Sequence, residues 1–452
     1  MAQHGSDDDD PKTLLPTLDS LASGFRKRTA VTAKLAARAG LRAASRSVFG
    51  ARQGEVDVQK AVEAARTMVT EMGQLKGLVM KAGQMASFLP GAMPEEAREI
   101  MAKLQSESAA MKYERVQEVV RAELGGEVDQ LFEGFEQSPF AAASIGQVHR
   151  ARVDGQPVAV KVQYPGIEAL LVGDLDFLGG LASVFTLRSP MDGRALAKEL
   201  RERTLEACDY VPEERHQQLF EGLLSTQEGC SVPAIVPSRS ARRVLTTRLV
   251  DGMRFQPFVD TASQAARDRA GERIFRVAFD SLFRHGVYNG DPHPGNYLFG
   301  DEGQVTFLDF GCVRYYQVDF IDAWKRVAMA AQDGDFDTFK KRFPDLGMTP
   351  KPKKMDWEAQ WDAMLQLYTP MRTRGPFFTF THAYVEESYG KLVFDNPNKL
   401  KMAMPAEWLL LNRLQWGLFA VLSHLGSTAP WPDIFRAALE APTRPVHLAD
   451  NP

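Results

Sequence analysis

Hydrophobic and polar residues follow different patterns in successive parts of the chain. Between about Leu14 and Leu124, apolar residues return at every third or fourth position, which predicts amphipathic helices. From about Leu131 short β-type runs appear, and from about Ala262 the helical spacing returns and continues to the end. The pattern predicts an α+β protein, in which a helical N-terminal extension precedes a small β-rich lobe and a larger helical lobe.

The β-rich part contains a strong hairpin signal. The runs 144–153 and 157–163 are joined by Asp154-Gly155, and an Asp-Gly pair between such runs is typical of a two-residue β-turn. A second β-type island, 296–299 and 305–308, interrupts the helical region and is joined by a glycine-bounded turn. We therefore expect one hairpin in each lobe.

Composition adds the general class of the protein. The 452 residues are 44% hydrophobic and 25% charged, which is typical of a globular protein and excludes disorder as the main state. The formal net charge of −4 argues against a nucleic-acid coat protein. Cys208, Cys230 and Cys312 lie far apart, so a disulfide framework or zinc ribbon is not expected, and a reducing, intracellular setting is.

The distribution of charged residues indicates how the chain could contact a membrane. The most apolar stretch, 408–425, carries Asn412, Arg413 and His424, so it predicts a buried helix rather than a span. The region 20–54 holds eight basic residues and no acidic one. This pattern is typical either of a solvated helix face or of a weak electrostatic contact with an anionic membrane surface. We expect a cytoplasmic protein that reaches membranes, if at all, peripherally.

The strongest chemical pattern lies around the second hairpin. Asp291 and Asn296 are five positions apart, and Asp309-Phe-Gly follows thirteen positions after the asparagine. Phosphoryl transfer from ATP needs an oxygen acceptor for the attacking group and hard oxygen ligands for Mg²⁺. Protein kinases carry the same Asp, Asn and Asp-Phe-Gly series, so we assign Asp291 as catalytic and Asn296 and Asp309 as metal ligands. The alternative is ordinary turn chemistry.

A lysine stands inside an apolar strand pattern. Lys161 ends the sequence Val-Ala-Val-Lys, and a kinase-like interpretation predicts that it neutralises nucleotide phosphates and pairs with a glutamate of a helix. Glu213 and Glu214 are both candidates, and Glu213 is preferred. A helical insertion at about 167–187 would explain the long separation.

A loop of small residues, 141–148, ends thirteen positions before Lys161. It has alanine at the first two positions where kinases have glycine, so we expect it to be stiffer and to bind phosphates differently. An alternative, compatible interpretation is a small-residue turn that permits close packing. The residues expected to lie against the nucleotide are Ala141, Ala142, Ala143, Ser144, Ile145, Gly146 and Val148.

Together these segments resemble a known family. Lys81-Ala-Gly-Gln84, PFAAASIGQVHRA, VAVKVQYPG, DPHPGN and Asp309-Phe-Gly occur in the order found in the UbiB family of atypical protein-kinase-like proteins. The resemblance implies a two-lobed kinase-like fold and use of ATP or ADP with Mg²⁺. It also implies transferase or ATPase activity linked to ubiquinone or other isoprenoid lipid metabolism, without phosphorylation of other proteins.

The resemblance also implies roles for the extension. In that family the KxGQ segment covers the site where a kinase holds its peptide, so Lys81 and Gln84 would reach the nucleotide site. Nucleotide and a lipid or isoprenoid-quinone precursor are the implied partners, nucleic acid is not, and the oligomeric state stays open. We expect an acidic disordered tail at 1–12, the helical extension at 13–130, the kinase-like N-lobe at 131–250 and the C-lobe at 251–452.

The chain departs from the family pattern in two places. The acidic motif before the helix glutamate reads Ala207-Cys-Asp209, with Glu206 one position early, and Arg248 replaces a glutamate near the hinge. After Gly311 a helical pattern begins almost at once, which leaves little room for a platform that binds protein substrates. Two alternatives stay open: a non-catalytic nucleotide-sensing scaffold and a small-molecule phosphotransferase.

Overall fold

The computed structural model describes most of the chain after residue 109. The described residues are 110–143, 145–169, 171–172, 201, 205–372, 377–399, 401–403 and 405–446. The expected acidic tail, the basic stretch 20–54, Lys81, Gln84 and Ser144 lie outside them, as does most of the expected helical insertion.

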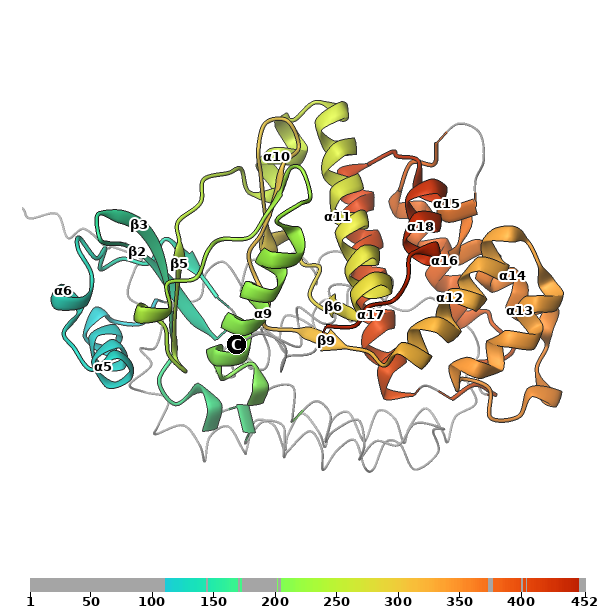
Figure 1. Cartoon of the computed structure of the whole chain (residues 1–452), viewed down its shortest axis with the longest axis horizontal. Helices are drawn as coiled ribbons and strands as arrows, with labels where there is room; N and C mark the ends of the chain where they lie inside the picture. The colour runs from blue at the N-terminus through green and yellow to red at the C-terminus, as the bar shows by residue number, and fades with distance from the viewer. Residues whose placement is uncertain are drawn as a thin grey trace, which may run out of the picture.

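The first lobe is built on a four-stranded antiparallel sheet with the order β1-β2-β3-β5 (Figure 1). Its strands are β1 (Ala141–Ala142), β2 (Gly146–Val153), β3 (Gln156–Gln163) and β5 (Val244–Arg248). As the sequence predicts, β2 and β3 form a two-residue hairpin, in which Asp154 and Gly155 have φ values of 53° and 71°. Both residues adopt the left-handed conformation that such a turn requires.

Helices cover both faces of this sheet. On one face, α5 (Tyr113–Leu124) and α6 (Val128–Leu131) share a hydrophobic cluster with Val158, Val160 and Val162 of β3. The lobe therefore begins before residue 131, where the sequence pattern placed its boundary, because the apolar face of α5 is buried against the sheet. On the other face lies α9 (Tyr210–Leu224), whose first turn is capped by the side chain of Asp209.

Short elements connect the two lobes. A three-stranded sheet joins β4 (Cys230–Ser231) to β8 (Val305–Phe307) and β7 (Tyr297–Phe299), which is the predicted second hairpin. A two-stranded sheet pairs β6 (Val287–Asn289) with β9 (Val313–Tyr315). The turn η5 (Pro294–Asn296) completes this region, whereas η4 (Pro237–Arg239) precedes β5 in the first lobe. These small sheets hold the ends of the predicted catalytic segments together.

The second lobe is helical, and its long helix α11 stands on the side nearer the first lobe (Figure 1). Its helices are α10 (Phe255–Thr261), α11 (Gln264–His285), α12 (Val318–Asp333), α13 (Phe336–Arg342), α14 (Trp357–Leu367), α15 (Thr369–Arg372), α16 (His382–Tyr389), α17 (Ala406–Leu425) and α18 (Trp431–Glu440), with the turns η6 (Phe343–Leu346), η7 (Pro352–Lys354) and η8 (Gly390–Phe394).

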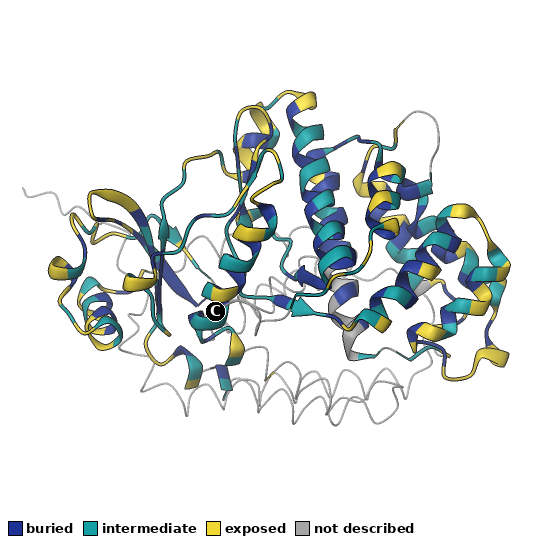
Figure 2. Cartoon of the chain, viewed as in Figure 1, coloured by how far each residue is buried: buried dark blue, intermediate teal, exposed yellow. Residues whose placement is uncertain are grey.

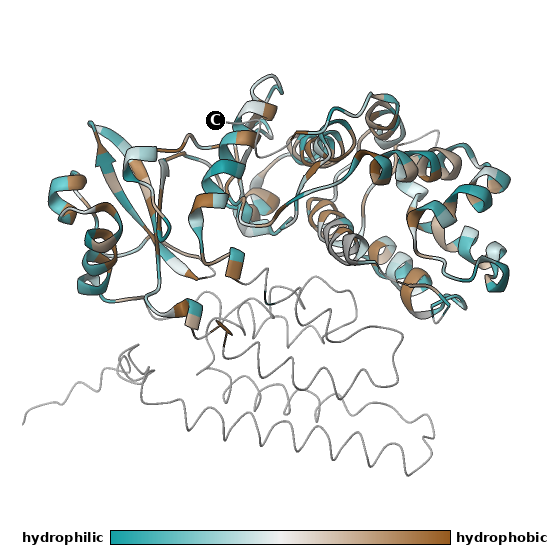
Figure 3. Ribbon diagram, turned by 60° about the horizontal axis from the view of Figure 1, so that its bottom comes forward, coloured by the Kyte–Doolittle hydropathy of each residue, from teal (hydrophilic) through white to brown (hydrophobic). Residues whose placement is uncertain are grey.

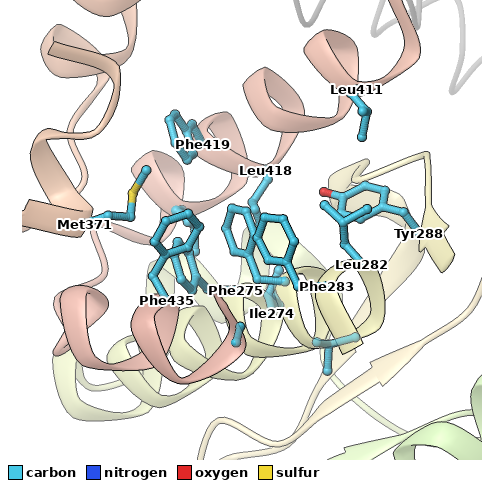
Figure 4. Close-up of a cluster of buried hydrophobic side chains, with 14 of the residues drawn as sticks. Ile274, Phe275, Leu282, Phe283, Tyr288, Met371, Leu411, Leu418, Phe419 and Phe435 are labelled. Atoms are coloured by element: carbon cyan, nitrogen blue, oxygen red, sulfur yellow. The ribbon is translucent and has the colours of Figure 1, made fainter. Parts of the chain in front are cut away.

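Aromatic side chains fill the core of this lobe. Phe275 and Phe283 of α11 pack with Phe435 of α18 and with Leu418 of α17 (Figure 4). Buried positions run along α11, and exposed ones gather on the outer helices (Figure 2). Hydrophobic and hydrophilic stretches alternate along the helices, as amphipathic packing requires (Figure 3). The same cluster includes buried residues of β6, β7, β8 and β9, so this core supports the segments that carry the predicted site.

The stretch expected to be a buried helix is confirmed as α17, and its residues Leu418 to Leu422 include four that are almost fully buried. Within the part of the chain that the structure describes, no helix has the length and apolar content needed to cross a membrane.

Candidate active site

Lys161 lies where the sheet meets α9. In the strand register it is flanked by Val148 of β2 and Leu245 of β5. Its ammonium group donates a 2.7 Å hydrogen bond to Oε1 of Glu213, which is 5% exposed. Of the two glutamates that the sequence offered, the structure therefore pairs Glu213 with the lysine, and Glu214 lies on a different side of the helix.

The surroundings keep Lys161 charged. Burial lowers the pKa of its ammonium group, but the carboxylates of Glu213 and Asp309 outweigh burial and hold the pKa above its ordinary value. The Nζ atom also lies 4.7 Å from the centre of the Tyr210 ring, a cation–π distance. A permanent positive charge is therefore fixed at the base of the site.

Asp309 completes the group around the lysine. Its Oδ2 atom lies 3.9 Å from Lys161 Nζ, and its Oδ1 atom accepts a hydrogen bond of 2.9 Å from the Gly311 amide. The Asp309 side chain is 33% exposed, so its carboxylate lies at an accessible edge of the site. The side-chain amide of Asn289 donates to the Asp309 carbonyl at 2.7 Å and fixes the backbone at this point.

Phe310, the residue after Asp309, holds this segment against α9. It is fully buried, and its ring packs against Phe220 of α9 with centroids 5.0 Å apart. Its carbonyl lies 3.2 Å from Nδ1 of His216, also on α9. Because a carbonyl only accepts, Nδ1 carries the proton in this hydrogen bond. Burial lowers the pKa of His216 although this hydrogen bond raises it. Thus α9 is attached to the Asp309 segment along its length.

The second hairpin brings Asn296 and Asp291 to the same place. The Asn296 amide donates to the Asp291 carbonyl at 2.9 Å, and Leu308 donates to the Asn296 carbonyl at 3.0 Å. The hairpin β7–β8 thereby returns the chain so that Asn296 and Asp309 stand at its two adjacent ends. The Gly290 amide, which precedes Asp291, donates to the Cys312 carbonyl at 2.7 Å.

The donor set fits a magnesium ion. With its NH₂ group directed to Asp291, Asn296 keeps its side-chain oxygen for a ligand, and Asp309 offers a partly exposed carboxylate. These are the hard oxygen ligands that Mg²⁺ prefers, and Mg²⁺ takes its other ligands from phosphates and water. Among the described residues, no group of three His, Cys, Asp or Glu side chains could hold a metal ion alone.

A small cavity of about 30 Å³ lies beside the segment from Asp291 to Asn296. It is large enough for about two water molecules. Asn289, Asp291 and Asn296 line part of it, and Oδ1 of Asn289 is buried without a hydrogen-bond partner in the described residues.

The alanine-rich loop is a tight turn between β1 and β2. The Ala143 amide donates to the Gly146 carbonyl at 2.9 Å, and the Ile145 side chain is buried beside Tyr210. A Cβ atom on Gly146 would lie 2.4 Å from the Val162 carbonyl oxygen. Glycine is thus required here by the close approach of β3, as the packing interpretation of the sequence suggested.

The remaining loop positions frame this turn. Ala141 and Ala142 form β1, and they pair with Val148 and Gln147 of β2. Val148 is half-buried and lies opposite Lys161 in the register.

The segment after Gly311 is short, as the sequence predicts. It contains only β9 before α12 begins at Val318. Arg314 of β9 lies 3.2 Å from Glu206, the carboxylate that the sequence offered in place of the family's acidic residue. This ion pair adds one more contact between the Asp309 segment and the approach to α9.

Sequence reasoning did not identify Asn289 and His216 as parts of the site. Asn289 belongs to a three-residue strand, too short for a visible alternation, and His216 is one of several polar residues on a helix of mixed character. Each of them binds a backbone carbonyl of the Asp309 segment. The sequence gives no sign of such contacts, because they depend on how distant segments meet.

Comparisons with known proteins agree with this geometry. Residues 103–343, more than half of the chain, match the ABC1 atypical kinase-like domain. The chain is 27% identical over 414 residues to the atypical kinase COQ8 of Saccharomyces cerevisiae, covering 89% of this chain and 82% of the relative. It is 31% identical over 382 residues to coq-8 of Caenorhabditis elegans, covering 82% of this chain and half of the relative.

Among solved structures, Rv3197 of Mycobacterium tuberculosis, determined in complex with erythromycin, aligns with a TM-score of 0.65 and 27% identity. The alignment covers 86% of this chain and 98% of that one. With the family's domain over more than half of its length and the Lys161, Asp291, Asn296 and Asp309 segments assembled as in a kinase, the chain belongs to the UbiB family of ABC1-type atypical kinase-like proteins.

Proposed function

We propose that this protein binds ATP with Mg²⁺ and catalyses transfer of the terminal phosphoryl group to water or to a small acceptor. The observation that carries the proposal is the convergence of Lys161, paired with Glu213, and the Asp309 carboxylate in one site. Phosphoryl transfer is catalysed mainly by positioning and electrostatic stabilisation, and these residues supply both.

Each residue has a distinct role in this proposal. Lys161 neutralises phosphate charge, and Glu213 holds its ammonium group in place. Asn296 and Asp309 hold Mg²⁺, which would neutralise the charge that develops on the phosphate oxygens. Asp291 accepts a hydrogen bond from the attacking hydroxyl or water and orients it. The turn from Ala141 to Gly146, with Val148, would cover the nucleotide, and Lys81 and Gln84 would reach it from the extension.

The acceptor is proposed to be a small molecule and not a protein. The chain between Gly311 and α12 is too short to form the long segment on which peptide-directed kinases bind their substrates. The COQ8 names of the relatives support a role in ubiquinone or other isoprenoid lipid metabolism. The basic stretch 20–54 would provide a peripheral contact with anionic membranes.

Binding and turnover measured together test this proposal. The purified full chain should be stabilised against heat by ATP plus Mg²⁺ and should release phosphate, more so with anionic vesicles or phenolic quinone-precursor mimics. Stabilisation without turnover under all these conditions would favour the alternative, a nucleotide-sensing scaffold. Phosphate transfer to a soluble alcohol would favour a small-molecule phosphotransferase.

A further inference from the structure

A buried polar cluster lies behind the alanine-rich loop, on the face of β2 turned away from Lys161. It consists of the side chains of Gln147 and His149, which are 1% and 0% exposed, and the backbone of Met111. None of these groups belongs to the site described above. Buried polar side chains are costly unless they are fully hydrogen-bonded, so such a cluster needs a specific reason.

Gln147 holds the backbone of Met111 with both ends of its amide. Its Oε1 atom accepts from the Met111 N–H at 2.7 Å, and its Nε2 atom donates to the Met111 carbonyl at 3.2 Å. The Gln147 side chain therefore bonds both the N–H and the carbonyl of Met111, as the backbone of a neighbouring β-strand would. Met111 is itself buried, and it lies two residues before the start of α5.

His149 secures this amide from the side. The second hydrogen of Gln147 Nε2 points to His149 Nε2 at 2.9 Å, and His149 Nδ1 lies 2.8 Å from the Glu136 carbonyl. Because an amide nitrogen only donates, His149 Nε2 must accept, and Nδ1 carries the proton that goes to Glu136. The imidazole ring also stacks on Phe135, with centroids 4.9 Å apart.

The cluster is connected directly to the loop over the site. Gln147 follows Gly146, and its backbone pairs with Ala142 of β1 on one side and with Val162 of β3 on the other. Its side chain and that of Val148 point to opposite faces, since successive strand residues alternate. A displacement of Met111 relative to the sheet would therefore also displace Gln147, the residue that follows the turn from Ala143 to Gly146.

We propose that Gln147 and His149 are positioning residues that hold the alanine-rich loop against the backbone of Met111. Nucleotide binding at this loop is thereby coupled to the position of the segment that precedes α5. The inference rests on the proposed nucleotide site. It adds a mechanical link between that site and the chain that leads into the lobe from the extension.

Nucleotide affinity in two variants tests the link. Gln147→Met keeps the size of the side chain and removes all three hydrogen bonds, so we expect the Kd for an ATP analogue to rise about tenfold. The value of kcat at saturating ATP should stay within about twofold of wild type, since the Asp291 loop is untouched. His149→Phe keeps the ring but leaves the Met111 contact in place, and should have a smaller effect on the same Kd.

A matched control separates positioning from loss of stability. Gln360 of α14 is also 1% exposed and bonded to one buried partner, Asn396, in the helical lobe. Gln360→Met makes the same replacement at a buried position in the helical lobe, removes one hydrogen bond instead of three, and should leave nucleotide affinity unchanged. If the Kd in Gln147→Met is no higher than in the Gln360→Met protein, the inference is wrong.

Hydrogen exchange tests the coupling without any substitution. Coupling between two sites is reciprocal, so if the loop and Met111 are linked, nucleotide binding must slow exchange of the Met111 amide. Unchanged exchange at Met111 in nucleotide-bound wild type would overturn the inference and leave the proposed function standing. Failure of wild type to bind nucleotide at all would instead remove the proposed function, and the coupling with it.

Discussion

The two halves of the candidate site are assembled in different ways. The lysine half depends on a contact between residues 52 positions apart, Lys161 and Glu213, and both side chains are largely buried. The acidic half is local, because Asp291, Asn296 and Asp309 are placed by one short hairpin and are more accessible. The difference indicates that the lysine half should carry fold stability and nucleotide affinity, and that the acidic half should carry the chemical step.

Removing the lysine gives the largest expected effect on stability. Lys161→Met removes the ammonium group that is hydrogen-bonded to the buried Glu213 carboxylate, and breaking a buried ion pair in this way costs about 3–5 kcal/mol. Unfolding by urea would measure the loss, and nucleotide affinity should fall as well. The double variant Lys161→Met/Glu213→Leu should recover most of the free energy of unfolding but not nucleotide affinity. Recovery of both would contradict a binding role for Lys161.

The acidic half should respond in the opposite way. Asp291→Asn removes the group that orients the attacking oxygen, and we expect kcat to fall roughly a hundredfold, in the range typical of general-base residues. The Kd for ATP and the free energy of unfolding should change little, because Asp291 is partly exposed at a local turn. A change in the Kd as large as that in kcat would show that the two halves are not separable.

Glycine positions near the lysine half give a smaller, sharper comparison. In Gly146→Ala the new Cβ atom would lie 2.4 Å from the Val162 carbonyl, so overpacking should destabilise the fold by about 1–3 kcal/mol. At Gly222 of α9 a new Cβ atom would meet no atom within 4 Å apart from the nearby backbone of its own helix, so Gly222→Ala should stabilise by about 0.5–1 kcal/mol. Thermal unfolding of both variants should give shifts of opposite sign.

The smallest expected effect concerns the pH dependence of the free energy of unfolding. Burial lowers the pKa of His216 below its ordinary value of 6.5 and outweighs the hydrogen bond to the Phe310 carbonyl, which raises it; Arg314 lowers the pKa further and Glu206 raises it. Below pH 6.5 the unfolded chain binds a proton that the folded chain does not, so His216 contributes stability above that pH and loses it on acidification. His216→Asn should make the free energy of unfolding fall less between pH 7 and pH 5. An unchanged slope would show that His216 does not titrate differently on folding.

Sequence patterns predicted the local half of the site better than the long-range half. The spacing of Asp291, Asn296 and Asp309 already implied a hairpin, and β7–β8 has that form. The turn at Asp154-Gly155 was equally predictable, because its conformation depends on those two residues alone. Local geometry can be read from sequence when few neighbours influence it.

Contacts between distant segments could not be predicted in the same way. The sequence offered Glu213 and Glu214 and preferred Glu213, and the orientation of α9 against the sheet confirms that Glu213 is the partner of Lys161. The hydrogen bond from Gln147 to Met111 joins positions 36 apart and has no periodicity to reveal it. The lobe boundary was also placed too late, because helical spacing in α5 looks the same whether the helix packs on an extension or on a sheet.

The most direct test of the central claim is Mg²⁺-dependent ATP turnover by the full chain and by its Asp309→Asn variant. The substitution keeps the size of the side chain and an acceptor for the Gly311 amide, but removes the carboxylate that would hold the metal. We predict that wild type releases phosphate only with Mg²⁺ and that the variant loses this activity, with its melting temperature nearly unchanged. Undiminished Mg²⁺-dependent turnover in Asp309→Asn would contradict the assignment of this site.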